Sequence, residues 1–250
     1  MWNKELELAK EAAKAAGSFL KRRENICVDA LDGKDIKLSS DKMSEKIIMD
    51  ILKKSNLPVL SEECGFQGEE GELCWIVDPL DGTINYFKGL DEFACVSVAL
   101  WQKDRPVLGV VYRFMADELF YGCEGDGAYL NGERVRPSGV RETSQAVMAA
   151  GFPVKRSYDT ESLGAFVKQV QRFKKVRMLG AAAIMGTFVS CGRLDAYMED
   201  EIMLWDIAGA VAIVNAAGGA ASLELLDDNK CLCKCFATKE LMEDYYVKSL

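Results

Sequence analysis

The segment WIVDPLDGTINY, residues 75–86, is the most informative stretch of this 250-residue chain. Its first three residues are apolar and typical of a buried strand. The apolar run stops at Asp78, a proline stiffens the backbone, and a second carboxylate follows at Asp81. Gly82 and Thr83 come directly afterwards. The segment is also a good turn sequence, but two carboxylates at a strand end beside a Gly-Thr pair indicate a place where a ligand is held.

Two carboxylates that lie close together raise each other's pKa and need a compensating cation. The chain contains no histidine, so the natural compensating partner is a hard cation with oxygen ligands, above all Mg²⁺. If a helix or turn begins at Gly82, its free backbone N–H groups attract an anion such as phosphate. The Thr83 hydroxyl is then placed to orient a water. Together these features favour metal-assisted hydrolysis of a phosphate ester.

Further acidic residues lie at the ends of predicted elements: Asp41, Glu62 with Glu63, and Asp206. Each of them has a purely structural alternative. Asp206, and Asp41 for a helix at 42–54, are good N-cap residues. Glu62 and Glu63 are equally well explained as solvated loop charges. The spacing of these residues in the sequence does not prove that they meet in space. The prediction of a site therefore depends on the occurrence of all of them in one chain.

Composition excludes several classes of function. A net charge of −8 without a basic tract argues against nucleic acid or an anionic membrane as the main partner. The absence of histidine excludes Ser-His-Asp and Cys-His catalysis, and any zinc site that needs imidazole. The N-terminal MWNKELELAK lacks the apolar core of a signal peptide, and residues 207–221 are too short to span a membrane.

Nine cysteines, an odd number scattered among apolar neighbours, predict reduced and mostly buried thiols in a cytoplasmic protein. Three of them alternate in CLCKCF, residues 231–236, on one face of a predicted strand. Packing is favoured there over metal binding. A redox switch stays an open alternative.

The sequence predicts two α/β lobes, residues 1–140 and 141–250, that form one structural unit. In the first lobe we predict a turn-rich connection at 31–41 and an exposed loop at 65–72. The other elements of this lobe are helices 4–23 and 42–54, strands 57–60, 74–77, 93–101, 106–112, 118–122 and 127–130, and a hairpin at Asn131-Gly132. The second lobe alternates through strand 145–150, helix 160–172, strand 174–179, helix 181–191, strand 194–198, helix 206–217, strands 220–225 and 231–237, and helix 238–247.

Three motifs resemble the inositol monophosphatase family in order and spacing: SEE (61–63), WIVDPLDGTINY (75–86) and LWDIAGA (204–210). An AGG at 217–219 extends the match over nearly the whole chain. The resemblance implies an α/β fold, an αβαβα layered sandwich of the sugar-phosphatase type. It also implies a cytoplasmic homodimer and a phosphatase that requires two or three Mg²⁺ ions.

The resemblance also implies roles for individual residues. The implied metal ligands are Glu62, Asp78, the Leu80 carbonyl, Asp81 and Asp206. Gly82 and Thr83 bind the phosphate through backbone N–H groups, while Thr83 and Glu62 orient the attacking water. Asp41 corresponds to the acid that hydrogen-bonds the threonine.

On the substrate side, the implied contacts come from Asp81, Gly82, Thr83, Gly180, Ala181, Ala182, Glu199 and Asp206. Glu199 matches an acid that binds the hydroxyl groups of the alcohol. Met203 stands where many inositol phosphatases carry histidine, and 31–41 looks like the loop of archaeal and bacterial members that often accept inositol phosphate and fructose bisphosphate. Three arginines either serve a second phosphate or are solvated surface charges: Arg156, Arg172 and Arg177.

We therefore expect Mg²⁺-dependent hydrolysis of a small polyol or sugar phosphate, first of all inositol-1-phosphate. The enzymatic alternatives are fructose-1,6-bisphosphatase, 3′(2′),5′-bisphosphate nucleotidase and histidinol-phosphatase. The alternative from another class is a regulatory or binding protein that retains the fold. The complete acidic set with Thr83 speaks against an inactive protein.

Overall fold

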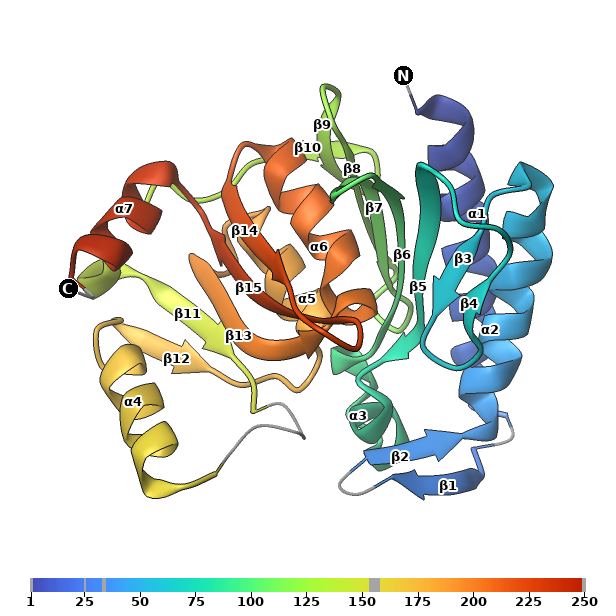
Figure 1. Ribbon diagram of the computed structural model, residues 1–250, viewed down its shortest axis with the longest axis horizontal. Coiled ribbons are helices and arrows are strands. Elements are labelled where there is room, and N and C mark those ends of the chain that lie inside the picture. Colours follow the sequence, from blue (N-terminus) through green and yellow to red (C-terminus); the bar gives the residue numbers. More distant parts are fainter. Residues whose placement is uncertain (1, 25, 33–34, 153–157, 249–250) are drawn as a thin grey trace.

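Two β-sheets stack with helices between them and on both outer sides (Figure 1). The computed structural model describes residues 2–24, 26–32, 35–152 and 158–248. From one side to the other, the layers are two helices, an eight-stranded sheet, two central helices, a five-stranded sheet, and two further helices. This order confirms the αβαβα sandwich expected from the sequence.

The eight-stranded sheet is antiparallel except for the pairing of its strands β3 and β5, which run parallel. In spatial order its strands are β10 (Glu133–Val135), β9 (Gly127–Leu130), β8 (Glu118–Cys123), β7 (Arg105–Arg113), β6 (Cys95–Gln102), β5 (Leu73–Asp81), β3 (Val59–Ser61) and β4 (Gly65–Gln67). The predicted hairpin is confirmed, because Asn131 and Gly132 join β9 to β10 with φ values of 49° and 90°.

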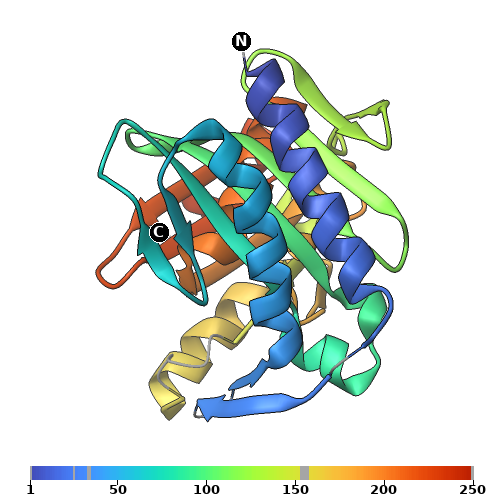
Figure 2. The ribbon, with the colours of Figure 1, turned by 90° about the vertical axis from the view of Figure 1, so that its right-hand side faces the viewer.

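Strand β5 is buried on both faces, which explains its continuous apolar start. Trp75 and Val77 pack into the core shared with the outer helices α1 (Asn3–Leu20) and α2 (Ser39–Leu52), which cross the sheet in Figure 2. Ile76 points the other way and packs toward the central helices. Because side chains alternate along a strand, Asp78 continues on the face of Ile76, toward the centre of the molecule.

The five-stranded sheet is mixed: β11 is parallel to both of its neighbours and the remaining pairs are antiparallel. Its spatial order is β12 (Lys175–Arg177), β11 (Val147–Ala150), β13 (Ala196–Met203), β15 (Lys230–Phe236) and β14 (Ala220–Leu225). Helices α4 (Thr160–Val170) and α7 (Lys239–Val247) lie on its outer side in Figure 1.

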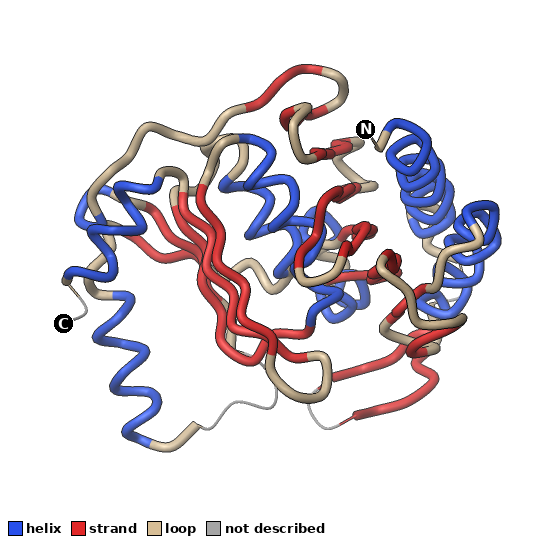
Figure 3. The backbone as a smooth tube through the Cα atoms, turned by 45° about the horizontal axis from the view of Figure 1, so that its top comes forward, coloured by secondary structure: helices blue, strands red, loops and turns tan. Residues whose placement is uncertain are grey.

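The central helices α5 (Ala182–Val189) and α6 (Leu204–Ala217) lie between the two sheets, as the view in Figure 3 shows. Helix α6 is apolar nearly all round, as a helix enclosed by two sheets must be. It approaches β7 very closely, since a Cβ on Gly109 would lie 2.1 Å from the Gly209 carbonyl oxygen. The helix ends at Gly218 with φ +95°, as the glycine pair predicted.

Three strands were not predicted. The connection expected to be turn-rich contains the hairpin β1 (Val28–Asp32) and β2 (Asp35–Leu38), and the loop expected at 65–72 begins with β4. These strands are only three to five residues long, too short for an alternating pattern to identify them, and each is stabilised by a partner strand. Short helices fill other connections: α3 (Thr83–Lys88), η1 (Lys53–Ser55), η2 (Asp91–Phe93) and η3 (Thr143–Gln145).

All nine cysteines are free thiols, and five of them are buried. Cys231, Cys233 and Cys235 lie within the apolar core of the five-stranded sheet, with the last two sulfur atoms 4.0 Å apart. This confirms the packing interpretation of CLCKCF. Among the described residues no helix is long and apolar enough to cross a membrane.

Candidate active site

The two aspartates of the opening motif face the same side of the sheet because β5 contains a bulge. Asp78 pairs with Ser97 on β6, whereas Asp81 pairs with Cys95, so three steps along β5 oppose two steps along β6. In a regular strand, residues three apart face opposite sides, and one extra residue restores them to the same side. The proline between them was the sequence signal for this bulge, since proline inside a strand favours one.

The start of α6 brings Asp206 to this pair of carboxylates. Asp206 is the third residue of α6, and the N-cap position is Met203, so the N-cap alternative for Asp206 is wrong. The carboxyl groups of Asp206 and Asp78 lie close enough for their charges to interact. Asp81 is held by the other central helix, because its Oδ2 accepts a 2.8 Å hydrogen bond from the N–H of Ala183 at the start of α5.

Glu62 reaches the same edge because β3 runs parallel to β5, so the two strands end side by side. Its own N–H donates to the Val77 carbonyl at 3.3 Å. The turn that carries Glu62 is held from α2 by a buried acid that sequence reasoning missed. Glu45 accepts hydrogen bonds from the Ser61 hydroxyl and, at 3.0 Å, from the Cys64 N–H. The only feature of the sequence that could have pointed to Glu45 is its position, one helical turn after Asp41.

The alternative that Glu62 and Glu63 are solvated loop charges is wrong for Glu63. Its side chain is only 6% exposed and pairs with Lys37 of the hairpin strand β2, with Nζ and Oε1 3.0 Å apart. Glu62 itself is partly buried. The pKa of Glu62 is raised by burial and by the charge of Glu63, while Lys37 acts in the opposite direction.

Burial raises the pKa of every carboxyl group in the set, and for Glu62, Asp78 and Asp206 repulsion by neighbouring acids adds to it. For Asp78 and Asp206 the pKa lies well above the ordinary value, first because of burial and then because of the neighbouring acids. Burial also raises the pKa of Asp81, although the N–H of Ala183 opposes the shift. Such a group of acids keeps protons at neutral pH or requires cations.

The donor set fits a hard divalent cation, since it consists of carboxylate oxygens beside a backbone carbonyl. In the ranges that the structure describes, however, no three acidic or cysteine side chains stand in coordinating geometry. Asp78 accepts a hydrogen bond from the Leu80 N–H at 2.9 Å, and Asp81 accepts one from the Ala183 N–H of α5. Binding of a cation would therefore require these side chains to exchange their present hydrogen bonds for metal contacts.

The Gly-Thr pair begins α3, as the sequence suggested. Gly82 has φ +83°, and a Cβ there would lie 2.4 Å from the Phe93 carbonyl oxygen, so no other residue fits without a shift. The Thr83 hydroxyl donates to the Leu80 carbonyl at 2.9 Å. The predicted hydrogen bond from Thr83 to Asp41 is therefore not formed here, because a hydroxyl has a single hydrogen to donate.

Asp41 lies in the first turn of α2 and is not its N-cap residue, because the helix starts at Ser39. Its Oδ2 accepts from the Leu38 N–H at 2.8 Å, and its buried Oδ1 has no hydrogen-bond partner among the described residues. Burial raises the pKa of Asp41 to about 7. An unpartnered buried carboxyl oxygen is costly unless a proton or a ligand compensates it.

The predicted substrate segment lies against the Gly-Thr pair. A Cβ on Gly82 would come within 3.2 Å of the Ala181 side chain. Asn85, which sequence analysis did not single out although it lies within the opening motif, joins the two segments. Its Nδ2 donates to the carbonyl oxygens of Phe93 at 2.9 Å and Leu179 at 2.8 Å. Gly180 and Ala182 flank Ala181, at the start of α5.

Glu199 lies on β13 and is buried. Its Oε2 accepts from the Tyr197 hydroxyl at 2.9 Å, and a Cβ on Gly151 would lie 2.4 Å from that same oxygen. The Glu199 carboxylate is thus packed beneath the backbone at Gly151.

The three arginines considered for a second phosphate differ in position. Arg172 donates to the Tyr245 carbonyl and lies over the Tyr245 ring, so it packs helix α7 onto its sheet. Arg177 is exposed and donates to its neighbour's carbonyl, while Arg156 lies outside the described residues.

Comparison with known proteins agrees with this geometry. The model of the inositol monophosphatase family matches residues 1–223. The Nus factor SuhB of Pasteurella multocida is 35% identical over 225 residues, which cover 87% of this chain and 84% of that protein. The fructose-1,6-bisphosphatase/inositol-1-monophosphatase of Aquifex aeolicus is 37% identical over 229 residues, which cover 88% of this chain and 86% of that protein.

A solved structure has the same fold. The extragenic suppressor protein SuhB from Bartonella henselae superposes with a TM-score of 0.86 and 30% sequence identity, covering 98% of this chain and 99% of that chain. The shared fold thus extends over nearly all of the molecule, including β3, β5 and α6, whose ends carry the acidic residues. The chain therefore belongs to the inositol monophosphatase family.

Proposed function

We propose that the protein is a Mg²⁺-dependent phosphomonoesterase that hydrolyses a small polyol or sugar phosphate, with inositol-1-phosphate as the first candidate substrate. The observation that supports this most strongly is the convergence of Asp78, Asp81 and Asp206 beside Gly82 and Thr83. The three acids come from β5 and α6, more than one hundred residues apart in the chain. An acid cluster beside a glycine-led helix start suits metal-assisted phosphate chemistry.

The residues that would hold Mg²⁺ are Glu62, Asp78, the Leu80 carbonyl, Asp81 and Asp206. When bound, the cations neutralise charge on the phosphate oxygens and lower the pKa of a coordinated water. Two or three ions match the number of carboxylates, because each Mg²⁺ bound by proteins takes one or two of them.

The chain's own groups would position the substrate and move the proton. The backbone N–H groups at Gly82 and Thr83 would hold phosphate oxygens at the start of α3. The Thr83 hydroxyl would turn from the Leu80 carbonyl toward Asp41, whose free Oδ1 is an acceptor within the same buried region, and would then accept a hydrogen from water. Glu62, whose carboxylate lies at the end of β3 beside this turn, would take the proton of that water.

The alcohol would contact the backbone of Gly180, Ala181 and Ala182, and its hydroxyl groups would approach Glu199. Two kinds of relative bear on the choice of substrate. The Aquifex protein is named for both fructose-1,6-bisphosphatase and inositol-1-monophosphatase activity, which supports testing both esters. The Pasteurella protein is named as a Nus factor, which supports a regulatory role as a second candidate function.

The direct test measures phosphate release with Mg²⁺ and with EDTA. The panel contains inositol-1-phosphate, fructose-1,6-bisphosphate, 3′-phosphoadenosine 5′-phosphate and histidinol phosphate. Asp81→Asn is expected to abolish turnover while the protein stays folded, because it removes a ligand charge and no core packing. Asp50→Asn is the matched control, since Asp50 is an exposed acid on α2. Strong Mg²⁺-dependent release of one ester that Asp81→Asn loses supports the proposal.

Release that persists in EDTA, or wild-type turnover in Asp81→Asn, would contradict it. If no ester is hydrolysed at all, the regulatory candidate gains support, and a pulldown from lysate with and without Mg²⁺ tests it through a stable macromolecular partner. Size-exclusion chromatography with light scattering checks the proposed homodimer.

A further inference from the structure

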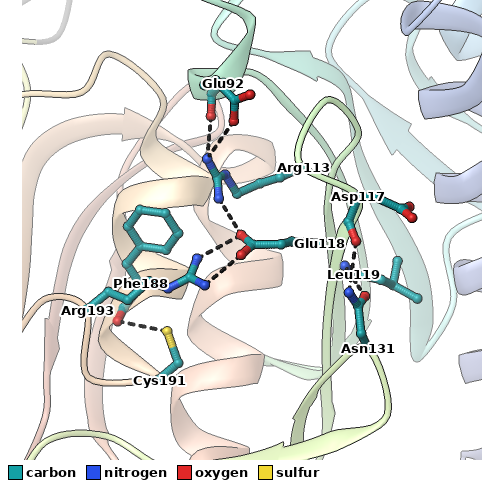
Figure 4. A network of polar contacts seen from close by, with 9 residues as sticks. All are labelled: Glu92, Arg113, Asp117, Glu118, Leu119, Asn131, Phe188, Cys191 and Arg193. Atoms are coloured by element: carbon teal, nitrogen blue, oxygen red, sulfur yellow. Dashed lines mark hydrogen bonds and ion pairs between the residues drawn. The ribbon is translucent and has the colours of Figure 1, made fainter.

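A network of ion pairs joins the two halves of the chain at the end of α5 that lies away from Asp81 (Figure 4). Glu118, at the start of β8, accepts two hydrogen bonds from Arg193, at 2.6 and 2.7 Å, and a third from Arg113 of β7. The side chain of Glu118 is only 18% exposed. None of these residues belongs to the motifs that predicted the candidate active site.

Glu118 is held rigidly on its own sheet. The neighbouring Leu119 N–H donates to the Asn131 side chain at 2.8 Å, and the same side chain donates to the Asp117 carbonyl at 2.8 Å, as Figure 4 shows. The two guanidinium groups, Arg193 first, hold the pKa of Glu118 below its ordinary value. The acid is therefore ionised and fixed, as a bidentate arginine pair requires.

Arg193 is coupled to α5 through the backbone. The N–H groups of Arg193 and Leu194 both donate to the Phe188 carbonyl in the last turn of the helix, at 3.1 and 3.2 Å. The guanidinium group of Arg193 also lies over the Phe188 ring, 5.1 Å from its centroid. Movement of Arg193 would thus move the C-terminal end of α5.

The opposite end of α5 carries the contact with the candidate active site, namely the bond from the Ala183 N–H to Asp81. A helix of eight residues is a rigid rod about 12 Å long. It is attached to the eight-stranded sheet at both ends, by Asp81 at one end and by Glu118 at the other. These two polar attachments add to the apolar packing of α5 between the sheets and fix both of its ends against the eight-stranded sheet.

The same network reaches the other wall of the Gly-Thr turn. Arg113 donates to the Glu92 carbonyl at 2.7 Å within η2. The next residue, Phe93, presents the carbonyl that lies against Gly82 and accepts from Asn85. Glu118 thus connects, through two arginines, to both segments that enclose Gly82.

We propose that Glu118 and Arg193 are positioning residues: their ion pair fixes α5 against the eight-stranded sheet and thereby keeps Asp81 and the Gly180–Ala182 backbone in register with the Gly-Thr turn. The role of Asp81 as a metal ligand is the part of this inference that rests on the proposed function. The attachment of α5 is a property of the fold and is measurable without any substrate.

The test compares hydrogen exchange of the peptide spanning α5 in the wild type, Arg193→Met and Arg193→Lys. Removing one partly exposed charge-assisted pair is expected to make exchange of this peptide about five to ten times faster. The lysine variant keeps the charge and loses the bidentate geometry, so it should reverse only part of this change. Arg105→Met is the matched control. It breaks another arginine–glutamate pair beside the same sheet, in which Nη2 of Arg105 donates to both carboxylate oxygens of Glu124, at 2.9 and 3.1 Å, and which does not touch α5.

In a second readout, the Mg²⁺ concentration that gives half-maximal activity should rise about fivefold in Arg193→Met and stay unchanged in Arg105→Met. If the protein has no phosphatase activity, the hydrogen-exchange result still tests the attachment of α5. The proposed function and the positioning role can therefore be refuted independently. Unchanged exchange of α5 in Arg193→Met, or an equal change in Arg105→Met, would overturn the inference. If Arg193→Met does not fold, Glu118→Asp, which keeps the charge and shortens the arm, must show the same exchange change in smaller degree, and its absence counts against the proposal.

Discussion

The buried acids predict an unusual dependence of stability on pH in metal-free protein. Asp41 is 3% exposed, and its pKa in the folded state is about 7 against an ordinary value of 3.8. Between these two values the folded protein keeps a proton that the unfolded chain has lost. The unfolded state then binds fewer protons, so the free energy of unfolding falls as pH rises.

The size of the effect follows from the shift. One group that titrates in this way lowers the free energy of unfolding by about 1.4 kcal/mol per pH unit, and the shift of Asp41 alone integrates to about 4 kcal/mol. The raised pKa values of Asp78, Asp81 and Asp206 act in the same direction. We therefore expect metal-free protein to be less stable at pH 8 than at pH 5.

Mg²⁺ should remove the part of this dependence that comes from Asp78, Asp81 and Asp206, because cation and protons compete for the same oxygens, whereas the part from Asp41 should remain. The assay is urea unfolding followed by circular dichroism at pH 5, 6, 7 and 8, in EDTA and in saturating Mg²⁺. Mg²⁺ should stabilise strongly at pH 8 and weakly at pH 5. Asp78→Asn serves as the control, because it removes one titrating ligand and should reduce both the slope in EDTA and the gain from Mg²⁺. A metal-free stability that is flat or rises between pH 5 and 8, or an equal Mg²⁺ gain at both ends, would refute the reasoning.

Three further substitutions test the packing around the site by thermal unfolding. Gly82→Ala should lower the free energy of unfolding by clearly more than the ~1–2 kcal/mol that a left-handed backbone conformation costs an alanine, because its Cβ also meets a backbone carbonyl. Gly132→Ala, with φ +90° and open space around the new Cβ, should show the conformational cost alone. Equal losses in the two variants would contradict the close contact at Gly82. Cys233→Ser places a hydroxyl in a dry core and should cost about 1–3 kcal/mol, against almost nothing for the exposed Cys27→Ser. Glu45→Ala leaves two hydrogen-bond donors of the turn that carries Glu62 unpaired, so it should lower the free energy of unfolding by about 1–3 kcal/mol and weaken Mg²⁺ binding. An unchanged Mg²⁺ affinity, measured by calorimetry, would show that this turn does not depend on Glu45.

Much of the layered fold was predictable because its elements follow local rules. The apolar faces of α1 and α2 have helical period, and the strands between 95 and 130 are apolar runs separated by turns. The short strands β1, β2 and β4 were missed because three to five residues contain too few alternations to indicate a strand. Their stability comes from a partner strand, which a local pattern does not contain.

The acidic residues of the candidate site were all recognisable in the sequence, since a strand that stops at Asp78 and a helix that opens near Asp206 are local features. The hydrogen bonds around them were not. Thr83 donates to Leu80 rather than to Asp41, a choice made by distances within the folded chain. The roles of Glu45 and Asn85 depend equally on segments that pack against them.

By itself, therefore, the sequence determined which residues can bind a cation and a phosphate, because residue type and spacing along one strand or helix settle chemical capacity. Only the tertiary structure decided how those residues are held. The bulge in β5 turns Asp81 toward α5, and Glu118 meets Arg193 across 75 positions of sequence. Contacts between residues so far apart depend on how whole layers pack, and no local pattern records that packing.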